Sequence, residues 1–290
     1  MRAQRKQIAF IGIGTKTAAP LLYSYLRLHP AVCVMPEDTQ FFSNTKVYAQ
    51  GIDWYESQLG KCLPGMQHGE LSFSYLESIP ALGLIAKTYP SAKLLAVIEN
   101  PLVSVRVAYV EARRLSKVGE RFSLAQFLKQ NPEVLMSARY GKQLSEYFSF
   151  YAPTDLMVIT ASDVRDDTLK VIERAYEHIG VDKKFIPVIL RHLIPPDESE
   201  LKVKPGIIKR TYRAIKKFIK GIFTALHTRF FPAAVPIETA SIVARKLPLS
   251  PDLEAFLKDY YRRDVAILSH LLHRDLSVEW GFEEDTTGPE

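Results

Sequence analysis

The sequence predicts an α/β fold in which helices flank both faces of a parallel sheet. Three short apolar segments have the length of buried strands, and each leads into a segment with helical periodicity. These segments are Gln7–Ile13, Lys93–Ile98 and Leu156–Thr160. Strands that alternate with helices need crossover connections, which produce parallel strands covered by helices. The chain has 290 residues, 47% of them hydrophobic, and is long enough to bury a sizeable core.

The first strand, Gln7–Ile13, ends beside two glycines and leads into a helix over Ala18–Leu28. A second helix is expected around Ala81–Thr88, before the strand Lys93–Ile98. The helix after that strand runs from Leu102 to about Ser116. It follows a proline, and proline is pre-organised for a helix start.

The third strand, Leu156–Thr160, precedes a helix over Thr168–Ile179 that ends at Gly180. Glycine is the residue expected just past a helix C-terminus. A closing helix is predicted over Leu253–Leu272, and Ser250-Pro251-Asp252 marks its start. No internal repeat is visible.

Positive charge is concentrated in one part of the chain. The net charge is +6, yet the stretch between Leu201 and Ile237 holds nine basic residues and no Asp or Glu, which leaves −3 elsewhere. A nucleic-acid-binding protein is usually basic over a broader surface, so we expect no nucleic-acid partner.

The sequence predicts a protein that is either free in the cytoplasm or peripheral to a membrane. No apolar run approaches the roughly 18–20 residues of a membrane span, and the run Ile8–Ile13 is too short for a signal-peptide core. Cys33 and Cys62 are far apart in the sequence and form no metal-binding or redox spacing. We therefore expect both to be reduced.

Two strand ends are candidate binding loops. Ligands of such sheets lie beyond the carboxyl ends of the strands, and here these ends carry Gly14-Thr15-Lys16-Thr17 and Glu99-Asn100-Pro101. The first loop suits an anion, because backbone N–H groups, a helix N-terminus and the Lys16 ammonium would face it. It is not a nucleotide-triphosphatase loop, since Phe10 and Thr15 stand where that pattern needs glycine.

Segments along nearly the whole chain resemble the sulfotransferases that use 3′-phosphoadenosine 5′-phosphosulfate (PAPS), in particular the heparan sulfate and related bacterial branch. The matching segments are, in order, Phe10–Thr17, Leu22–Pro30, Glu37–Phe42, Gly51–Tyr55, Gly69-Glu70 with Ser74–Leu76, Ala92–Leu95 before Asn100-Pro101, Arg139–Leu144, Ser162–Val164, and Leu253–Leu272 with Arg274–Leu276 and Trp280. The resemblance implies one domain over residues 1–290, with a parallel sheet like that of the phosphate-loop proteins.

The resemblance also implies which residues bind PAPS. The 5′-phosphosulfate would lie on the loop after the first strand, and the 3′-phosphate would lie near two side chains on the helix after the second loop. The first set is Thr15, Lys16, Thr17, Ala18 and Ala19, and the second is Ser104 and Arg106.

The chain departs from the family pattern at several of these ligands. Ala18, Ala19 and Pro20 replace Gly-Thr-Thr, while Glu99 and Val107 replace an arginine and a serine that contact the 3′-phosphate. Such losses would cost roughly 3–6 kcal/mol of binding free energy together. Glu99 would in addition repel a phosphate.

By the same resemblance, Asp38 is the base that accepts a proton from the acceptor, and Lys16 is the cation on the leaving phosphate. Phe41 and Trp54 would lie near the acceptor. No metal is expected, because the seven histidines have no metal-binding spacing.

The basic stretch predicts an amphipathic helix, because apolar residues recur there at steps of three and four. The resemblance implies that this helix belongs to an insertion at about 202–231, since the family has a short loop there. Three interpretations are open. The helix docks on the domain with a solvated basic face, or residues 207–229 bind an anionic membrane surface, or the helix steers an acidic glycan or the cofactor.

The leading hypothesis is a PAPS-dependent sulfotransferase that acts on a hydroxyl or amine of a glycan, a lipid or a secondary metabolite. The alternatives are a non-catalytic binding module with the same fold and a transferase that uses a different anionic donor. The sequence does not name the acceptor.

Overall fold

The computed structural model describes residues 8–15, 19–35, 38–60, 62–115, 122–193 and 242–283. Five strands form one sheet in the order β2-β3-β1-β4-β5, and each adjacent pair is parallel. The strands are β1 (Phe10–Gly14), β2 (Val32–Val34), β3 (Gln67–Leu71), β4 (Lys93–Ile98) and β5 (Leu156–Thr160).

Helices make up most of the remaining described chain. They are α1 (Ala19–Leu26), α2 (Thr45–Tyr48), α3 (Ile52–Ser57), α4 (Ile79–Thr88), α5 (Pro101–Arg114), α6 (Leu124–Gln130), α7 (Pro132–Ser137), α8 (Tyr140–Phe150), α9 (Ala161–Asp166), α10 (Thr168–Ile179), α13 (Pro251–Leu272) and α14 (Leu276–Trp280). A 3-10 helix covers Val188–Leu193, and residues 242–246 are also helical.

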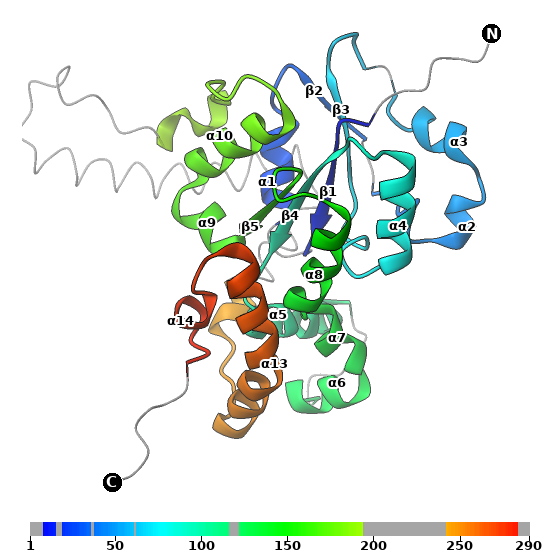
Figure 1. The fold of residues 1–290 in the computed structure, drawn as a ribbon. Helices are drawn as coiled ribbons and strands as arrows, with labels where there is room; N and C mark the ends of the chain where they lie inside the picture. The colour runs from blue at the N-terminus through cyan, green and yellow to red at the C-terminus, as the bar shows by residue number, and fades with distance from the viewer. Residues whose placement is uncertain are drawn as a thin grey trace, which may run out of the picture.

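Helices cover both faces of the sheet, which confirms the predicted fold class. In Figure 1, α1, α9 and α10 lie on one face and α4 and α8 lie on the other. Strand residues alternate between the two cores: in β4, Leu94 and Ala96 join one cluster, and Leu95 and Val97 join the other. A strand buried on both faces reads as a continuous apolar run, and this explains why β4 was visible in the sequence.

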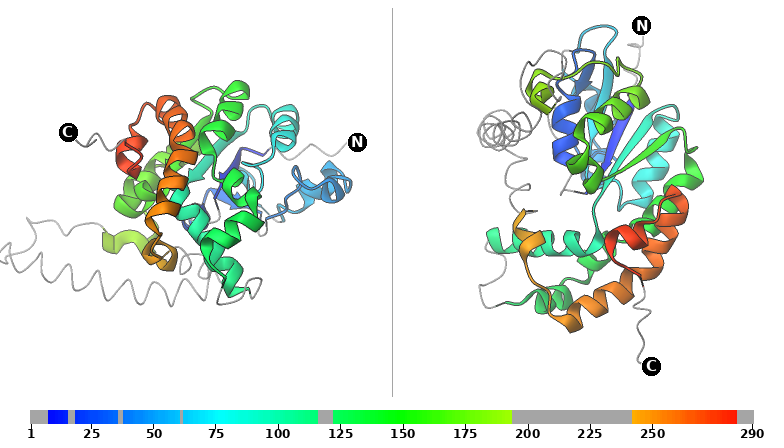
Figure 2. Two further views of the ribbon diagram at one scale, coloured as in Figure 1. Left: turned by 90° about the horizontal axis from the view of Figure 1, so that it is seen from below. Right: turned by 90° about the vertical axis from the view of Figure 1, so that its left-hand side faces the viewer.

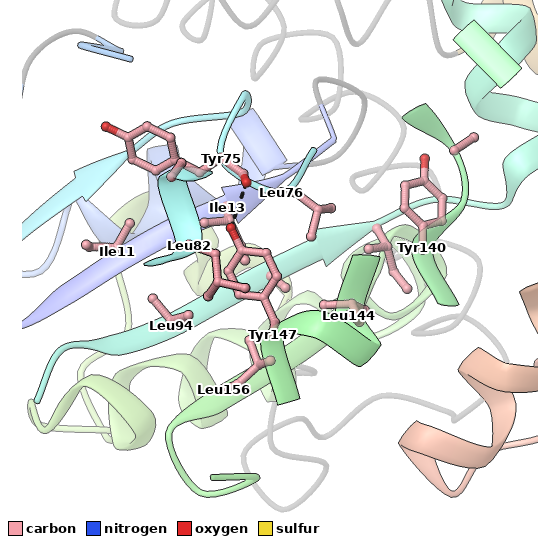
Figure 3. Close-up of a cluster of buried hydrophobic side chains, with 14 of the residues drawn as sticks. Ile11, Ile13, Tyr75, Leu76, Leu82, Leu94, Tyr140, Leu144, Tyr147 and Leu156 are labelled. Carbon is pink, nitrogen blue, oxygen red and sulfur yellow. Dashed lines mark hydrogen bonds between the residues drawn. The ribbon is translucent and has the colours of Figure 1, made fainter. Parts of the chain in front are cut away.

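The core on the α4 and α8 side includes polar anchors as well as apolar contacts. Figure 3 shows Tyr147 from α8 reaching across this core, where its hydroxyl donates a hydrogen bond of 2.7 Å to the carbonyl oxygen of Tyr75. The apolar side chains around it come from β1, α4, β4 and α8 and include Ile11, Leu82, Leu94 and Leu144. This hydrogen bond ties α8 to the loop that follows β3.

A group of helices lies at the end of the sheet toward which the strands point. Figures 1 and 2 show α5, α6, α7 and α13 gathered there. Asp264 of α13 is buried and accepts hydrogen bonds from the N–H groups of Gly141 (2.8 Å) and Lys142 (2.9 Å) at the start of α8. A Cβ at position 141 would lie 2.1 Å from the Asp264 carbonyl oxygen, so glycine is needed for α13 to approach α8 this closely.

The expectation of two reduced cysteines is wrong, because Cys33 and Cys62 form a disulfide with their Cα atoms 5.8 Å apart. They are 29 residues apart in sequence, but Cys33 lies in β2 and Cys62 lies shortly before the neighbouring strand β3. Disulfides of this kind are typical of proteins in oxidising compartments. The argument for a reducing compartment therefore fails.

Two further predictions are not tested by the fold. The basic helix predicted at 202–231 lies outside the described residues, so its membrane contact and its place in a single domain stay predictions. Among the helices that the structure describes, none is both long enough and apolar enough to cross a membrane.

Candidate active site

The two predicted loops lie side by side at the carboxyl edge of the sheet. The chain runs from β1 to β2 and β3 on one side and returns to β4 and β5 on the other, so the strand order reverses between β1 and β4. Gly14 at the end of β1 pairs with Val97 of β4, and a Cβ on it would lie 2.2 Å from the Val97 carbonyl oxygen. Its φ of +136° also excludes other residues, so only glycine permits this turn.

The backbone on either side of the first loop is fixed by hydrogen bonds. The N–H of Thr15 donates to the carbonyl of Val97 at 2.8 Å, and the N–H of Ala19, the first residue of α1, donates to the carbonyl of Thr15 at 3.3 Å. Lys16, Thr17 and Ala18 lie outside the described residues. The loop thus connects the sheet edge to a helix N-terminus, as the sequence predicted.

Tyr23 of α1 connects β1 and β4. Its hydroxyl donates to the carbonyl oxygens of Ile13 (2.7 Å) and Leu95 (3.2 Å), one on β1 and one on β4. Burial, together with the nearby carboxylate of Asp38, raises the pKa of Tyr23 well above its ordinary value. Ser72, which donates its hydroxyl to Asp38, also donates its N–H to the carbonyl of Gly12 at 2.9 Å, so Asp38 lies close to β1.

Asp38 is held by three hydrogen bonds from the loop after β3 and from its own turn. Its Oδ1 accepts from the Ser72 hydroxyl at 2.6 Å and from the Gln40 N–H at 3.2 Å, and its Oδ2 accepts from the Phe73 N–H at 3.4 Å. Asp38 itself is half-buried. Such a carboxylate is oriented and still accessible, as a proton acceptor needs to be.

Glu70 is a second carboxyl group near Asp38, and it is fully buried. It accepts hydrogen bonds from the hydroxyls of Thr39, Tyr55 (2.5 Å) and Tyr75 (2.8 Å). Burial raises its pKa to about 7; the three hydroxyls oppose this shift and the Asp38 charge adds to it. Glu70 thereby fixes Thr39, the neighbour of Asp38.

Glu99, at the end of β4, does not stand alone as a negative charge. It is 2% exposed, and its carboxylate contacts Arg245 and lies 3.4 Å from Arg165. Its Oε1 also accepts from the Asn100 N–H at 2.9 Å. Burial raises the pKa of Glu99, while the two guanidinium groups lower it. Glu99, Arg165 and Arg245 together carry a net charge of +1. The sequence had suggested instead that Glu99 would repel a phosphate.

Ser104 and Arg106, the predicted ligands on α5, both have protein partners. The Ser104 hydroxyl is 2.7 Å from the hydroxyl of buried Tyr140. Arg106 donates to the carbonyl oxygens of Leu102 (2.8 Å) and Leu247 (3.2 Å). Arg106 therefore joins α5 to the segment that carries Arg245.

Phe41 and Trp54 belong to one aromatic cluster. Phe41 is almost wholly buried, and its ring stacks on Tyr55 at 4.5 Å and on Trp54 at 6.1 Å between centroids. It also lines a pocket of about 390 Å³ with Tyr48, Gly51, Ile52, Lys87 and Thr88. Both residues therefore pack as core or near-core side chains, and their contact with an acceptor stays a prediction.

Sequence reasoning missed Arg165, Arg245 and the hydrogen-bonded role of Ser72. Arg165 follows the matching segment Ser162–Val164, and Ser72 lies between the matching residues Glu70 and Ser74. These positions were therefore adjacent to recognised motifs. Arg245 had no such signal. Within the described ranges, no three His, Cys, Asp or Glu side chains lie close enough together to hold a metal ion.

Comparisons with known proteins find sulfotransferases among the relatives of this chain. Heparan sulfate glucosamine 3-O-sulfotransferase 6 of Homo sapiens is 31% identical over 116 residues, which are 40% of this chain and 32% of that protein. Bifunctional heparan sulfate N-deacetylase/N-sulfotransferase 3 of Mus musculus is 23% identical over 289 residues, 91% of this chain and 30% of that protein. The chain thus spans about a third of the length of these relatives.

Among solved structures, a sulfotransferase from Alicyclobacillus acidocaldarius superposes with a TM-score of 0.67 at 19% identity, over 95% of this chain and 99% of that one. This likeness shows a shared fold. No model of a protein family matches the chain.

Proposed function

We propose that this chain, which belongs with the PAPS-dependent sulfotransferases by fold and by sequence relationship, transfers a sulfuryl group from PAPS to a hydroxyl or amine acceptor. The observation that carries the proposal is the position of Asp38. This oriented, half-buried carboxylate is held by Ser72, whose N–H bonds to Gly12 of β1, the strand that leads into the predicted anion-binding loop.

The residues at the two strand ends suit a donor with anionic groups at both its 3′ and 5′ positions. At the end of β1, Thr15, Lys16, Thr17, Ala18 and Ala19 would hold the 5′-phosphosulfate through backbone N–H groups, the Lys16 ammonium and the N-terminus of α1.

At the end of β4, Arg165 and Arg245 would supply the positive charge that Glu99 removes from the usual position. Ser104 and Arg106 on α5 would lie beside that 3′-phosphate site. Ser104 would face it with the hydroxyl that is bonded to Tyr140. The positive charges and hydrogen-bond donors of these residues suit the anionic groups of PAPS.

The chain's own residues would then divide the reaction between them. PAPS, when bound, supplies the sulfuryl group. Asp38 takes the proton from the acceptor hydroxyl or amine as the new bond to sulfur forms. Lys16 stabilises the negative charge that stays on the phosphate oxygen as its bond to sulfur breaks. Ser72 and the Phe73 N–H keep the Asp38 carboxylate aimed at the acceptor.

Calorimetric titration with adenosine 3′,5′-bisphosphate tests this proposal. We expect binding in the micromolar range. Lys16→Ala should abolish sulfuryl transfer, and Asp38→Asn should abolish transfer while nucleotide binding is kept. No heat at millimolar nucleotide would contradict the proposal and favour a binding module or a different anionic donor.

A further inference from the structure

Buried Glu70 is a titratable group that the proposed reaction does not use, and it lies two residues before Ser72 at the end of β3. Alternate residues of a strand point to the same face. Their partners are accordingly consecutive residues, because Ser72 donates to Asp38 and Glu70 accepts from Thr39. We propose that Glu70 is a positioning residue for the sulfuryl transfer, and that it holds residues 38–42, the Asp38 loop, only in its carboxylate form. This inference rests on the proposed function and deepens it by naming how the same site is regulated.

Two of the hydroxyl groups on Glu70 connect it to the backbone of the Asp38 loop. The Thr39 hydroxyl donates to Oε1 of Glu70 and accepts from the Phe41 N–H at 3.2 Å. The Tyr75 hydroxyl donates to the same oxygen at 2.8 Å and accepts from the Phe42 N–H at 3.2 Å. One buried carboxyl group thereby holds two consecutive backbone N–H groups through two hydroxyls.

The turn between Thr39 and Phe41 transmits this hold to the proposed base. Gln40 has a φ of +51°, in the left-handed region that non-glycine residues rarely occupy, and its N–H donates to Asp38 at 3.2 Å. A residue keeps such a conformation only when its surroundings enforce it. The contacts of Thr39 and Phe41 on either side of Gln40 do so. Glu70 therefore acts on Asp38 through the turn.

The hydrogen bonds at Glu70 require its carboxylate form. The Tyr55 hydroxyl is a third donor, at 2.5 Å from Oε2. An ionised carboxylate only accepts hydrogen bonds and satisfies all three hydroxyls, whereas a protonated carboxyl group adds a hydrogen of its own. One hydroxyl would then have to turn its proton away from Glu70. We expect protonation of Glu70 to loosen the Asp38 loop.

The groups around Glu70 place this ionisation close to neutral pH. Burial raises the pKa of Glu70 to about 7; the three hydroxyls oppose the shift and the charge of Asp38 adds to it. Tyr55 from α3 and Tyr75 from the loop after β3 also face Glu70, and burial raises the pKa of both above the ordinary value. Neither tyrosine therefore ionises in this range. The loop should be held above pH 7 and loosened below it.

Thr39→Val and Thr39→Ser test the connection between Glu70 and Asp38. The assay uses PAPS as the donor and chemically desulfated heparan sulfate, which has free hydroxyl and amine groups, as the acceptor. Thr39→Val keeps the shape of the side chain but loses the hydroxyl, and should lower kcat by about ten- to a hundredfold. Thr39→Ser keeps the hydroxyl and should stay near the wild type. Affinity for adenosine 3′,5′-bisphosphate should be the same in all three proteins. A wild-type kcat in Thr39→Val would overturn the inference.

Glu70→Gln tests the ionisation. The kcat of the wild type should fall as the pH is lowered through about 7, because Glu70 takes up a proton. Glu70→Gln should have a low kcat without this fall. Glu56→Gln is the matched control: Glu56 is a buried carboxyl group of α3 that accepts from the Tyr89 hydroxyl at 3.1 Å, and its variant should keep the wild-type pH profile. The inference is wrong if Glu70→Gln keeps that profile as well.

Carbon NMR of the carboxyl groups adds a readout that needs no acceptor. The Asp38 signal of the wild type should move as Glu70 ionises near pH 7, and this step should be absent in Glu70→Gln. A wild-type signal without the step would overturn the inference, whether or not the desulfated glycan is an acceptor.

Failure of this inference is distinguishable from failure of the proposed function. If the wild-type chain does not bind adenosine 3′,5′-bisphosphate, the sulfotransferase proposal fails. If it binds the nucleotide and transfers the sulfuryl group, and Thr39→Val and Glu70→Gln behave like the wild type, only the role of Glu70 fails.

Discussion

Buried Glu70 orders the loop around Asp38, but its burial also raises its pKa. Its three hydrogen bonds from Thr39, Tyr55 and Tyr75 hold the loop before Phe41, and Tyr75 also accepts from the Phe42 N–H at 3.2 Å. Burial penalises its charged form more than these bonds favour it, and its pKa rises from 4.5 to about 7. The residue therefore organises the Asp38 loop and makes the fold sensitive to pH.

The pH dependence of stability follows from this shift. Between pH 4.5 and about 7 the folded state keeps the Glu70 proton, which the unfolded state has lost. The contribution of Glu70 is thus fully present below pH 4.5 and is lost as pH rises to about 7. Glu70→Gln has no such titration. Relative to the wild type, its free energy of unfolding should rise by roughly 3 kcal/mol from pH 4.5 to 7.5.

Urea unfolding of both proteins at the two pH values measures this difference. Glu133→Gln, a change at an exposed carboxylate, is the control and should show no comparable change. If the free energies of unfolding of wild type and Glu70→Gln differ by the same amount at both pH values, Glu70 does not titrate in this range.

At the scale of elements, the disulfide closes the part of the chain that carries the Asp38 loop. Cys33 in β2 and Cys62 before β3 enclose α2, α3 and Asp38. Closing a loop of 29 residues restricts the unfolded chain and should stabilise the fold by about 3–4 kcal/mol. Reduction is therefore expected to lower the melting temperature of the wild-type protein.

Calorimetric melting with and without dithiothreitol checks this prediction. A variant with both cysteines replaced by serine should melt at the lower temperature and should not respond to the reductant. The prediction is wrong if the native, unreduced protein has two thiols that can be alkylated and dithiothreitol does not change its melting temperature. The disulfide would then not form in solution.

The elements that could be predicted were those with a clear periodicity. β4, β5 and α10 have the predicted bounds, and α13 begins after Ser250, which caps it by accepting from the Leu253 N–H. β2 and β3 were missed because β2 has three residues and β3 contains Gln67, His68 and Glu70, which break the apolar pattern of a buried strand. Glu70 is tolerated there because hydroxyl groups surround it.

At the scale of the whole molecule, the two neighbouring strand ends could be predicted, but the charge around Glu99 could not. The rule that ligands lie where strand order reverses predicted binding loops at the ends of β1 and β4, and the structure shows that these two strands are neighbours. The resemblance also singled out Asp38. The partners of Glu99, in contrast, come from 66 and 146 residues further along the chain. No local pattern links such distant residues, so Glu99 alone suggested repulsion of a phosphate.

The arginine pair on Glu99 leads to a prediction about nucleotide selectivity. Arg165 on α9 and Arg245 in the helical segment 242–246 converge on β4's end, where the 3′-phosphate is proposed to bind. Replacing either arginine by alanine should weaken binding of adenosine 3′,5′-bisphosphate by about 10–100-fold, the range of a hydrogen bond to a charged group. Binding of adenosine 5′-monophosphate, which lacks the 3′-phosphate, should change little.

Titration of each variant with both nucleotides measures the ratio of the two affinities, which cancels any general loss of folded protein. Arg174→Ala on the exposed face of α10 removes the same charge away from the site, and it should leave this ratio at the wild-type value. If Arg165→Ala and Arg245→Ala also leave the ratio unchanged, the arginines only neutralise Glu99. The selectivity for the 3′-phosphate would then have to come from other residues, because a buried carboxylate at the end of β4 cannot itself attract a phosphate.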